Sequence, residues 1–410
     1  MAGLFGAIAR PRAEVTELTM EEYFRLQSGG AMSGTGIAVS PDSAARYSTV
    51  LICLRVLSES VASLPCILYK RRADGGKDRA VDHPLYRVLH DQANDWNTAF
   101  EYTEGTMVNL ASRGNGFSYV ERNSKGQTIG LVPLNPDPVT ITQASDWTPK
   151  YEVTMPDNTR AKLAPSQIHH IRGPLPKGYV GQSMISMARE AIGLGLAAEQ
   201  FGAHLYKNGV KPSGVLKHPK AIGPEATESL RQQFQDKYGG LSNSSKPLLL
   251  EEGMEWVALS INPNDAQFLE TRRFQRSEIA GIFRVPAHFV NDLDKATFSN
   301  IEHQSLDFVV HAVRPCLIRW EQAINIDLMS AQDRADGYFC EFLMTAMLRG
   351  DTKSRYEAYA SAIQNKWMNA NEARILENMN PRDGGEVYEN PAIQVKPVDG
   401  TIPAPDIPAE

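Results

Sequence analysis

Long apolar runs are missing from this chain of 410 residues. No stretch approaches the roughly 18 to 20 consecutive apolar residues that a membrane-spanning helix requires, so we expect no membrane partner. Residues 1–9 form a short apolar stretch that precedes the first charge, Arg10. A secretion signal has the reverse order and a longer apolar core, so the sequence predicts no such signal.

Cysteine is scarce, with four residues in the chain. Cys53, Cys66, Cys316 and Cys340 stand in apolar surroundings, and no two of them have C-x-x-C spacing. We therefore expect reduced, buried thiols in a cytoplasmic protein rather than disulfides or a zinc site.

Histidines in metal-binding patterns are absent as well. His288, His303 and His311 lack an H-E-x-x-H arrangement or a compact carboxylate cluster, so we predict no metal and no cofactor. His169 and His170 are neighbours on an expected strand and must point to opposite faces, which prevents them from binding one ion together. We interpret them as core or surface residues.

Catalytic motifs are missing too. Residues 239–246 are rich in Gly and Ser and end in Lys, but they lack G-x-x-x-x-G-K-[ST] spacing and precede a strand rather than a helix. No Ser/His/Asp nucleophile motif occurs. The sequence predicts no catalytic residue, and therefore a protein that is not an enzyme.

An excess of positive charge is also lacking, since the net charge is −6 at pH 7. This balance argues against a protein that coats nucleic acid by bulk attraction. A protein past which DNA merely slides is compatible with it. Hydrophobic residues make up 42% of the chain, an ordinary share for a globular protein, and the length allows more than one structural region.

The first third of the sequence predicts mixed helix and sheet after a mobile arm. Residues 1–39 end in a Gly/Ser-rich stretch typical of such an arm. Ser40-Pro41 is an N-cap followed by proline, and it predicts a helix that continues to Leu64. Another helix is expected over residues 99–112. Strands are expected at 66–69, 117–120, 129–132, 139–142, 151–155 and 167–171.

The middle of the sequence predicts two long helices around a compact segment. The first, over residues 183–208, contains Gly193, Gly195 and Gly202. Each interior glycine costs about 0.5–1 kcal/mol relative to alanine, so we expect another backbone to approach closely. The second helix begins at Asn262-Pro263 and ends at Val285-Pro286. The strand–helix–strand segment between them is expected at 213–216, 224–238 and 248–259.

The last part of the sequence is predominantly helical. Ser299 and Glu302 form a capping box that opens a helix over residues 300–329, and Pro315 should kink it. Two more helices are expected at 351–366 and 370–378. The final segment, 387–410, is proline-rich and expected to be disordered.

Five short stretches in a fixed order carry a family resemblance. They are Gly114-Asn115-Gly116-Phe117, Tyr206-Lys207-Asn208-Gly209 through Pro212-Ser213-Gly214-Val215-Leu216, Phe283-Arg284-Val285-Pro286, Asn371-Glu372-Ala373-Arg374, and Gly384-Gly385. No single stretch is specific, but with their order and spacing the sequence resembles the portal proteins of long-tailed double-stranded DNA phages over residues 40–390. Glu386 departs from the family pattern, in which Asp often follows the Gly-Gly pair.

The resemblance implies an α+β portal fold with a defined order of regions. These are a flexible arm (1–39), a mixed α/β wing (40–182), a stem helix (183–209), a clip (210–261), a second stem helix (262–285), a tunnel loop (286–299), a kinked helix with return to the wing (300–350), a helical crown region (351–386) and a disordered tail (387–410).

The resemblance also implies a function as a dodecameric ring at one capsid vertex of the virion, assembled in the host cytoplasm. The ring would be the channel for DNA packaging and ejection. Implied partners are double-stranded DNA, the terminase large subunit, a head-completion adaptor and the major capsid or scaffold protein. A packaging ATPase or nuclease and a capsid shell protein remain alternatives, and the chain could equally come from a prophage or a gene-transfer particle.

The implied channel residues lie on the second stem helix and in the tunnel loop. Arg272 and Arg276 are one turn apart, and either phosphate contact or pairing with nearby glutamates explains them. Arg273 is expected to pair with Glu270, three residues away. In the loop, the channel candidates are Asn291, Asp292, Asp294 and Lys295, of which Lys295 could instead be a solvated loop lysine.

Two further groups complete the implied sites. Arg231 and Asp236 stand on the polar helix of the clip, where the resemblance implies docking of a motor or adaptor. Phe289 and Phe298 lie at the two ends of the tunnel loop and are expected to pack at its hinges.

Overall fold

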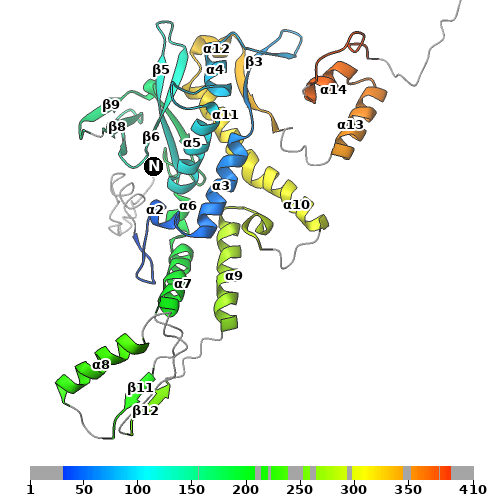
Figure 1. Ribbon diagram of the computed structural model, residues 1–410. Helices are drawn as coiled ribbons and strands as arrows, with labels where there is room; N and C mark the ends of the chain where they lie inside the picture. The colour runs from blue at the N-terminus through cyan, green and yellow to red at the C-terminus, as the bar shows by residue number, and fades with distance from the viewer. Residues whose placement is uncertain are drawn as a thin grey trace, which may run out of the picture. The chain divides into compact units, whose positions relative to one another are not determined.

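The computed structural model describes residues 31–155, 157–207, 214–219, 223–238, 253–258, 265–292, 298–344, 352–377 and 379–388. The chain divides into two compact units, residues 1–343 and 344–410. The first contains both helices and small antiparallel sheets, and the described part of the second is helical (Figure 1). The fold is therefore α+β.

The helices of the first unit alternate with its strands. They are α2 (Pro41–Ala44), α3 (Ser48–Ala62), α4 (Pro84–His90), α5 (Ala99–Arg113), α6 (Met184–Met187), α7 (Arg189–Lys207), α8 (Pro224–Tyr238), α9 (Asp265–Ile282), α10 (Phe298–Phe308), a π-helical turn η4 (Val309–Val313), α11 (Arg314–Asp327) and α12 (Ala331–Ala335), with 3-10 turns η1 (Pro165–Gln167) and η3 (Ala287–Val290).

The strands in the described part of the chain form five small sheets. They are the hairpin β1 (Ala31–Met32) with β2 (Ala38–Val39); the sheet β13 (Tyr338–Phe342), β3 (Cys66–Arg71) and β4 (Lys77–Arg79); the sheet β10 (Ile168–Arg172), β5 (Asn115–Arg122) and β6 (Thr128–Leu134); the sheet β7 (Val139–Gln143), β8 (Pro149–Thr154) and β9 (Arg160–Leu163); and the pair β11 (Gly214–Lys217) with β12 (Glu255–Ala258). Every strand pair is antiparallel.

The core lies where α5 and α11 cover the β5–β6–β10 sheet. Trp320 of α11 is buried there, and its indole Nε1 donates to the sulfur of Met107 of α5 at 3.0 Å. Behind the sheet, Phe117 packs in a cluster with alternate residues of β7 and β8, among them Ile141 and Val153. This alternation follows from the two-residue period of a strand whose one face is buried.

A tight crossing explains the Gly114-Asn115-Gly116 stretch. Gly114 has a left-handed φ of 80° at the end of α5, where a Cβ would collide with the backbone of Gln182. The Asn115 amide then bridges to Gly181, accepting from its N–H at 2.9 Å and donating to its carbonyl at 3.0 Å. Only glycine fits the first position, and an amide that donates and accepts fits the second.

Several predicted elements differ in the structure. Residues 31–39, expected to belong to the mobile arm, form the β1–β2 hairpin with Ser33 and Val39 buried. The helix predicted from Pro41 to Leu64 is interrupted, because α2 ends at Ala44 and α3 begins at Ser48. The first long helix is likewise interrupted at Ala188, between α6 and α7.

The helix predicted over residues 300–329 is irregular just before Pro315, where the kink was expected. The π-helical turn η4 separates α10 from α11, and it ends two residues before Pro315. Proline has no N–H for a helical hydrogen bond, so the regular ladder is interrupted here. The helix start differs, since α10 begins at Phe298 and Ser299 lies inside it instead of capping it.

His169 and His170 both lie in the core, which is one of the two interpretations that the sequence allows. His169 Nδ1 lies 2.9 Å from the Asp327 carboxylate on α11. His170 lies on the other face of β10, where its ring contacts Phe117 and hydrogen-bonds Tyr151 and Asn115. Both rings therefore fasten the sheet to its surroundings.

The second unit contains α13 (Thr352–Gln364) and α14 (Ala370–Leu376). Asn371, from the fourth of the five stretches, donates to the carbonyl of Arg382 at 2.9 Å and to the Glu386 carboxylate at 2.8 Å. Its backbone N–H donates to the Gly385 carbonyl at 3.0 Å. These hydrogen bonds hold the Asn-Glu-Ala-Arg and Gly-Gly stretches together, and the Glu386 carboxylate accepts one of them.

Some predictions lie outside the described residues. These are the glycine-rich 239–246 segment, the helix end at Asn208-Gly209, the helix start at Asn262-Pro263, Asp294, Lys295 and the tail beyond residue 388.

Candidate functional site

Helices α7 and α9 lie side by side (Figure 1). Arg272 of α9 donates from Nη2 to Glu199 Oε1 of α7 at 3.0 Å. The two side chains are 40% and 33% exposed, so water screens the pair and its contribution to stability is under about 1 kcal/mol. The partner of Arg272 is therefore a glutamate on the other helix, rather than one of the glutamates on its own helix.

Tyr47 fills the space beside Gly195 of α7. A Cβ on Gly195 would lie 2.9 Å from Cζ of the Tyr47 ring, which is closer than real Cβ contacts. Burial raises the pKa of the Tyr47 hydroxyl, and Glu199 adds to the rise, whereas Arg272 and Arg276 oppose it. The glycines predict the approach of another backbone, but the neighbour of Gly195 is a side chain of the same chain.

Gly193 has a second neighbour from the same chain. A Cβ there would collide with the side chain of Ser33 in the β1–β2 hairpin. The hairpin is also fixed by the backbone N–H of Gly34, which donates to Glu190 at 2.8 Å. The small residues of α7 therefore make room for residues 31–47.

The turn after α9 contains a residue in an uncommon conformation. Arg284 has a φ of 56°, in the left-handed region that residues other than Gly and Asn rarely adopt. Its neighbours Phe283 and Val285 are both buried. The two buried side chains hold the turn in this conformation, and it directs the arginine toward the π-helical turn.

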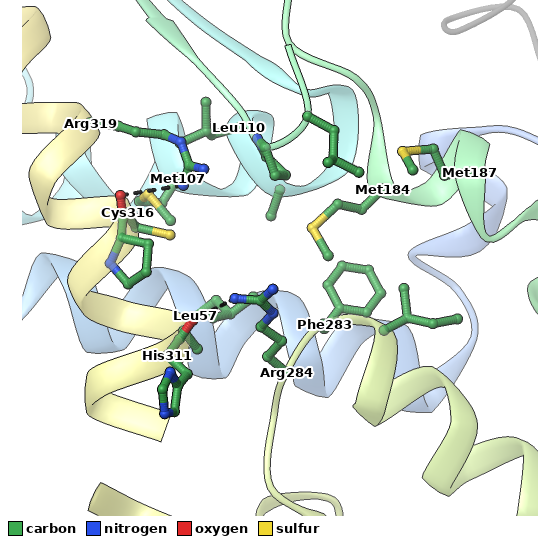
Figure 2. Close-up of a pocket in the computed structure, with 16 residues that line it drawn as sticks. Leu57, Met107, Leu110, Met184, Met187, Phe283, Arg284, His311, Cys316 and Arg319 are labelled. Carbon is green, nitrogen blue, oxygen red and sulfur yellow. Dashed lines mark hydrogen bonds between the residues drawn. The ribbon is translucent and has the colours of Figure 1, made fainter. Parts of the chain in front are cut away.

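Arg284 Nη1 donates to the carbonyl oxygen of His311 at 2.9 Å (Figure 2). In a regular helix this carbonyl would accept from the N–H four residues later, but that residue is Pro315, which has none. Arg284 therefore donates to a backbone acceptor that Pro315 cannot serve. The sequence places both residues, but gives no signal of the contact between them.

The tunnel-loop candidates are described in part. Asn291 has a left-handed φ of 58° and ends the 3-10 turn η3. The N–H of Asp292 donates to the Ala287 carbonyl at 3.0 Å. Phe289 is 40% exposed and its ring lies 5.5 Å from that of Phe308 on α10. The side chain of Phe298 lies outside the described residues, so its predicted packing stays a prediction.

The predicted clip contains the β11–β12 pair and α8. Arg231 lies 3.3 Å from Glu228 on α8, and both side chains are about two thirds exposed or more. Asp236 lies on the same helix, but its side chain is outside the described residues. Arg276 is partly exposed on α9, and Arg273 is exposed.

The thiols lie mostly in the core: Cys53, Cys66 and Cys340 are buried and Cys316 is half-buried. Burial raises the pKa of the Cys53 thiol to about 12. In the described parts of the chain, no three His, Cys, Asp or Glu side chains come together as a metal site. No helix among those residues is both long and apolar enough to cross a membrane.

Comparisons with known proteins agree on one family. The family model described as "Phage portal protein" matches residues 48–378. The probable portal protein of Streptomyces phage phiC31 is 31% identical over 95% of this chain and 88% of its own length. The portal protein of Enterobacteria phage HK97 is 30% identical over 83% of this chain and 81% of its own length.

A solved structure shares the fold. A chain in the neck of a native gene transfer agent particle, computed with C12 symmetry, matches with a TM-score of 0.55 and 21% identity. The match covers 88% of this chain and 94% of the other. Since the family model matches more than half of the chain, and both phage relatives are at least 30% identical over more than two thirds of it, the chain belongs to the phage portal protein family.

Proposed function

We propose that twelve copies of this chain form a ring at one vertex of a capsid, and that double-stranded DNA enters and leaves through its centre. The C12 symmetry of the particle neck supports the number of copies. Assembly in the host cytoplasm and a channel without enzymatic activity of its own belong to the same proposal.

The observation that carries the proposal is the exposed apolar surface of the helix pair. Leu194 of α7 is 48% exposed and Phe274 of α9 is 69% exposed. Side chains of this size on a long helix are typical of surfaces that another protein covers. A contact between α7 of one copy and α9 of the next is heterologous, and such contacts form a ring when the rotation between copies closes.

The helix lengths fit a channel wall. Helices α7 and α9 have 19 and 18 residues. At 1.5 Å per residue they are about 27 to 29 Å long, which is several base pairs of DNA. Their charged residues include Arg276, for which the described residues offer no carboxylate partner, and we propose that it contacts phosphate transiently.

The tunnel loop fits weak contact with DNA. Asp292 and Asp294 repel phosphate, whereas Lys295 attracts it, and repetition around a ring multiplies each effect. DNA has to slide through the channel, and strong attraction between the loop and phosphate would stop it. We propose that Asn291 and these three residues face the DNA.

The clip supplies the docking surface in this proposal. Helix α8 is strongly polar, with Arg231 and Glu228 on its exposed surface. The proposed partners are the terminase large subunit and a head-completion adaptor, with the major capsid or scaffold protein contacting other parts of the ring. The interface residues we propose are Arg231 and Asp236.

A packaging assay with assembled particles tests the channel. Asp292→Lys with Asp294→Lys should leave ring assembly intact but reduce packaging or genome retention, because twelve copies would hold phosphate tightly. Matched charge reversals on the clip, Arg231→Glu and Asp236→Lys, should reduce adaptor or motor binding instead. Normal packaging by the loop variant would show that the loop does not face DNA.

A further inference from the structure

A cavity of about 300 Å³ lies where α3, α5, α6, the end of α9 and the start of α11 meet. Figure 2 shows Met107, Leu110, Met184 and Phe283 around it, with Arg319 at the upper left and Arg284 below. Its volume is at the lower end of the range for ligand sites in proteins, and its lining is mostly apolar, as in such sites.

The edge of the cavity is apolar and exposed. Met187 of α6 is 54% exposed and Leu175 is 59% exposed, and both line the cavity. Methionine side chains adapt to irregular apolar surfaces, and α6 contributes two of them, Met184 and Met187. These residues offer a surface to an apolar side chain.

The charges around the cavity are cationic. Arg284 and Arg319 each donate to a backbone carbonyl, and no carboxylate is among the lining residues. Each guanidinium has five N–H donors, so both arginines can also donate to carboxylates of an occupant.

Residues 14–26 of the same chain have the matching chemistry. They read Glu-Val-Thr-Glu-Leu-Thr-Met-Glu-Glu-Tyr-Phe-Arg-Leu, with four glutamates, one arginine and several large apolar side chains. The carboxylates suit the arginines, and the apolar side chains suit the cavity.

The chain between residues 14–26 and the β1–β2 hairpin is also long enough for this segment to reach the cavity. Residues 31–34 are fixed on α7, since Gly34 N–H donates to Glu190, three residues beyond Met187. At about 3.3 Å per extended residue, the five residues from 26 to 31 reach about 17 Å and the 17 residues from 14 to 31 about 56 Å. The segment can therefore reach the cavity within its own chain.

We propose that residues 14–26 bind in this cavity of their own chain, with an apolar side chain among the methionines and glutamates paired with Arg284 and Arg319. Through Arg284, this contact would connect the N-terminal segment to the π-helical turn η4. It does not depend on ring formation.

Cys316 provides the test, since it lines the cavity and is half-buried. The alkylation rate of Cys316 by iodoacetamide is measured by mass spectrometry in the full chain, at alkaline pH because burial raises the pKa of its thiol. Deletion of residues 1–28 should raise this rate severalfold. Glu17→Lys with Glu21→Lys and Glu22→Lys, which keeps the length, should do the same.

Cys340, buried in β13, is the internal control, and its rate should not change. An unchanged Cys316 rate in both variants would overturn the proposal. A rise at both cysteines would also overturn it, because the segment would then act on overall stability. A bismaleimide cross-link from Phe24→Cys to Cys316 should stay within one chain, and a product of two chains would make a second copy the occupant.

Discussion

Arg284 and Pro315 lie 31 positions apart and meet at one backbone atom: Arg284 Nη1 donates at 2.9 Å to the His311 carbonyl, which Pro315 cannot serve. The contact connects the end of α9 to the π-helical turn between α10 and α11. In a ring, α9 would belong to the channel wall and α10 would follow the tunnel loop. The two residues thus join the parts that we propose to contact DNA.

Removal of the guanidinium should destabilise this junction. Arg284→Ala removes this donor from the His311 carbonyl and, because the hydrogen bond is exposed, should cost about 0.5–1.5 kcal/mol of unfolding free energy. Pro315→Ala restores an N–H that can serve the same carbonyl. In the double variant, the further loss from Arg284→Ala should be smaller, with a coupling of about 0.5 kcal/mol or more.

Chemical denaturation of the four proteins of this cycle measures the coupling. Strictly additive effects would mean that the arginine and the proline do not share the carbonyl. Arg284→Gly is a useful companion, because it removes the guanidinium but relieves the left-handed φ and should be less destabilising than Arg284→Ala.

The contact between Tyr47 and Gly195 predicts a second effect. Gly195→Ala places a methyl group against the Tyr47 ring and should destabilise the chain by about 1–3 kcal/mol. Gly105→Ala in α5 is the matched control, because its Cβ would meet open space. That variant should be neutral or stabilising by about 0.5–1 kcal/mol. Thermal unfolding of both variants decides; equal effects would contradict the close contact.

His170 predicts a pH dependence. Burial, with smaller contributions from Arg172 and His169, lowers the pKa of its imidazole to about 3. Below pH of about 6.5 the unfolded chain takes up a proton that the folded chain does not, so stability falls as the pH drops from there toward 3. The slope from this group is at most about 1.4 kcal/mol per pH unit.

Unfolding free energies of the wild type and His170→Gln between pH 7 and 4 test this assignment. The variant should be less stable at pH 7, where it loses hydrogen bonds to Tyr151 and Asn115, but should show a shallower decline toward acid. Parallel curves would show that other groups cause the acid sensitivity.

The two stem arginines should differ. Glu199 already neutralises Arg272, whereas Arg276 has no carboxylate partner among the described residues. We expect Arg276→Gln to reduce DNA packaging more than Arg272→Gln does, and Arg272→Gln to change stability by less than about 1 kcal/mol. Packaging yield per assembled particle is the measurement. A larger effect of Arg272→Gln would reverse the roles.

Local signals allowed much of the fold to be predicted. The helix over 99–112 has a capping box at Thr98 and Glu101 and ends at Gly114, and the structure confirms it within one residue. Contacts distant in sequence were missed. Strand β13 pairs with β3, some 270 residues earlier, and the sequence of β13 shows no clear alternation that would have indicated it.

The candidate site was less accessible from sequence. Helical spacing directs attention to Glu270 and Glu278 as partners of Arg272, but the partner is Glu199, 73 residues away. Arg284 stands inside one of the five recognised stretches, yet its role depends on a φ of 56° and on a carbonyl left open by a distant proline. Neither property is local, so spacing rules do not indicate it.

Electron microscopy of the purified chain tests the central claim most directly. The account predicts rings with twelvefold symmetry whose central channel admits a DNA duplex and is lined by the α7–α9 pairs. Ring formation should weaken in a variant that replaces the exposed apolar residues Leu194 and Phe274 by Asp. Closed shells, or single chains at every concentration and salt, would contradict the account.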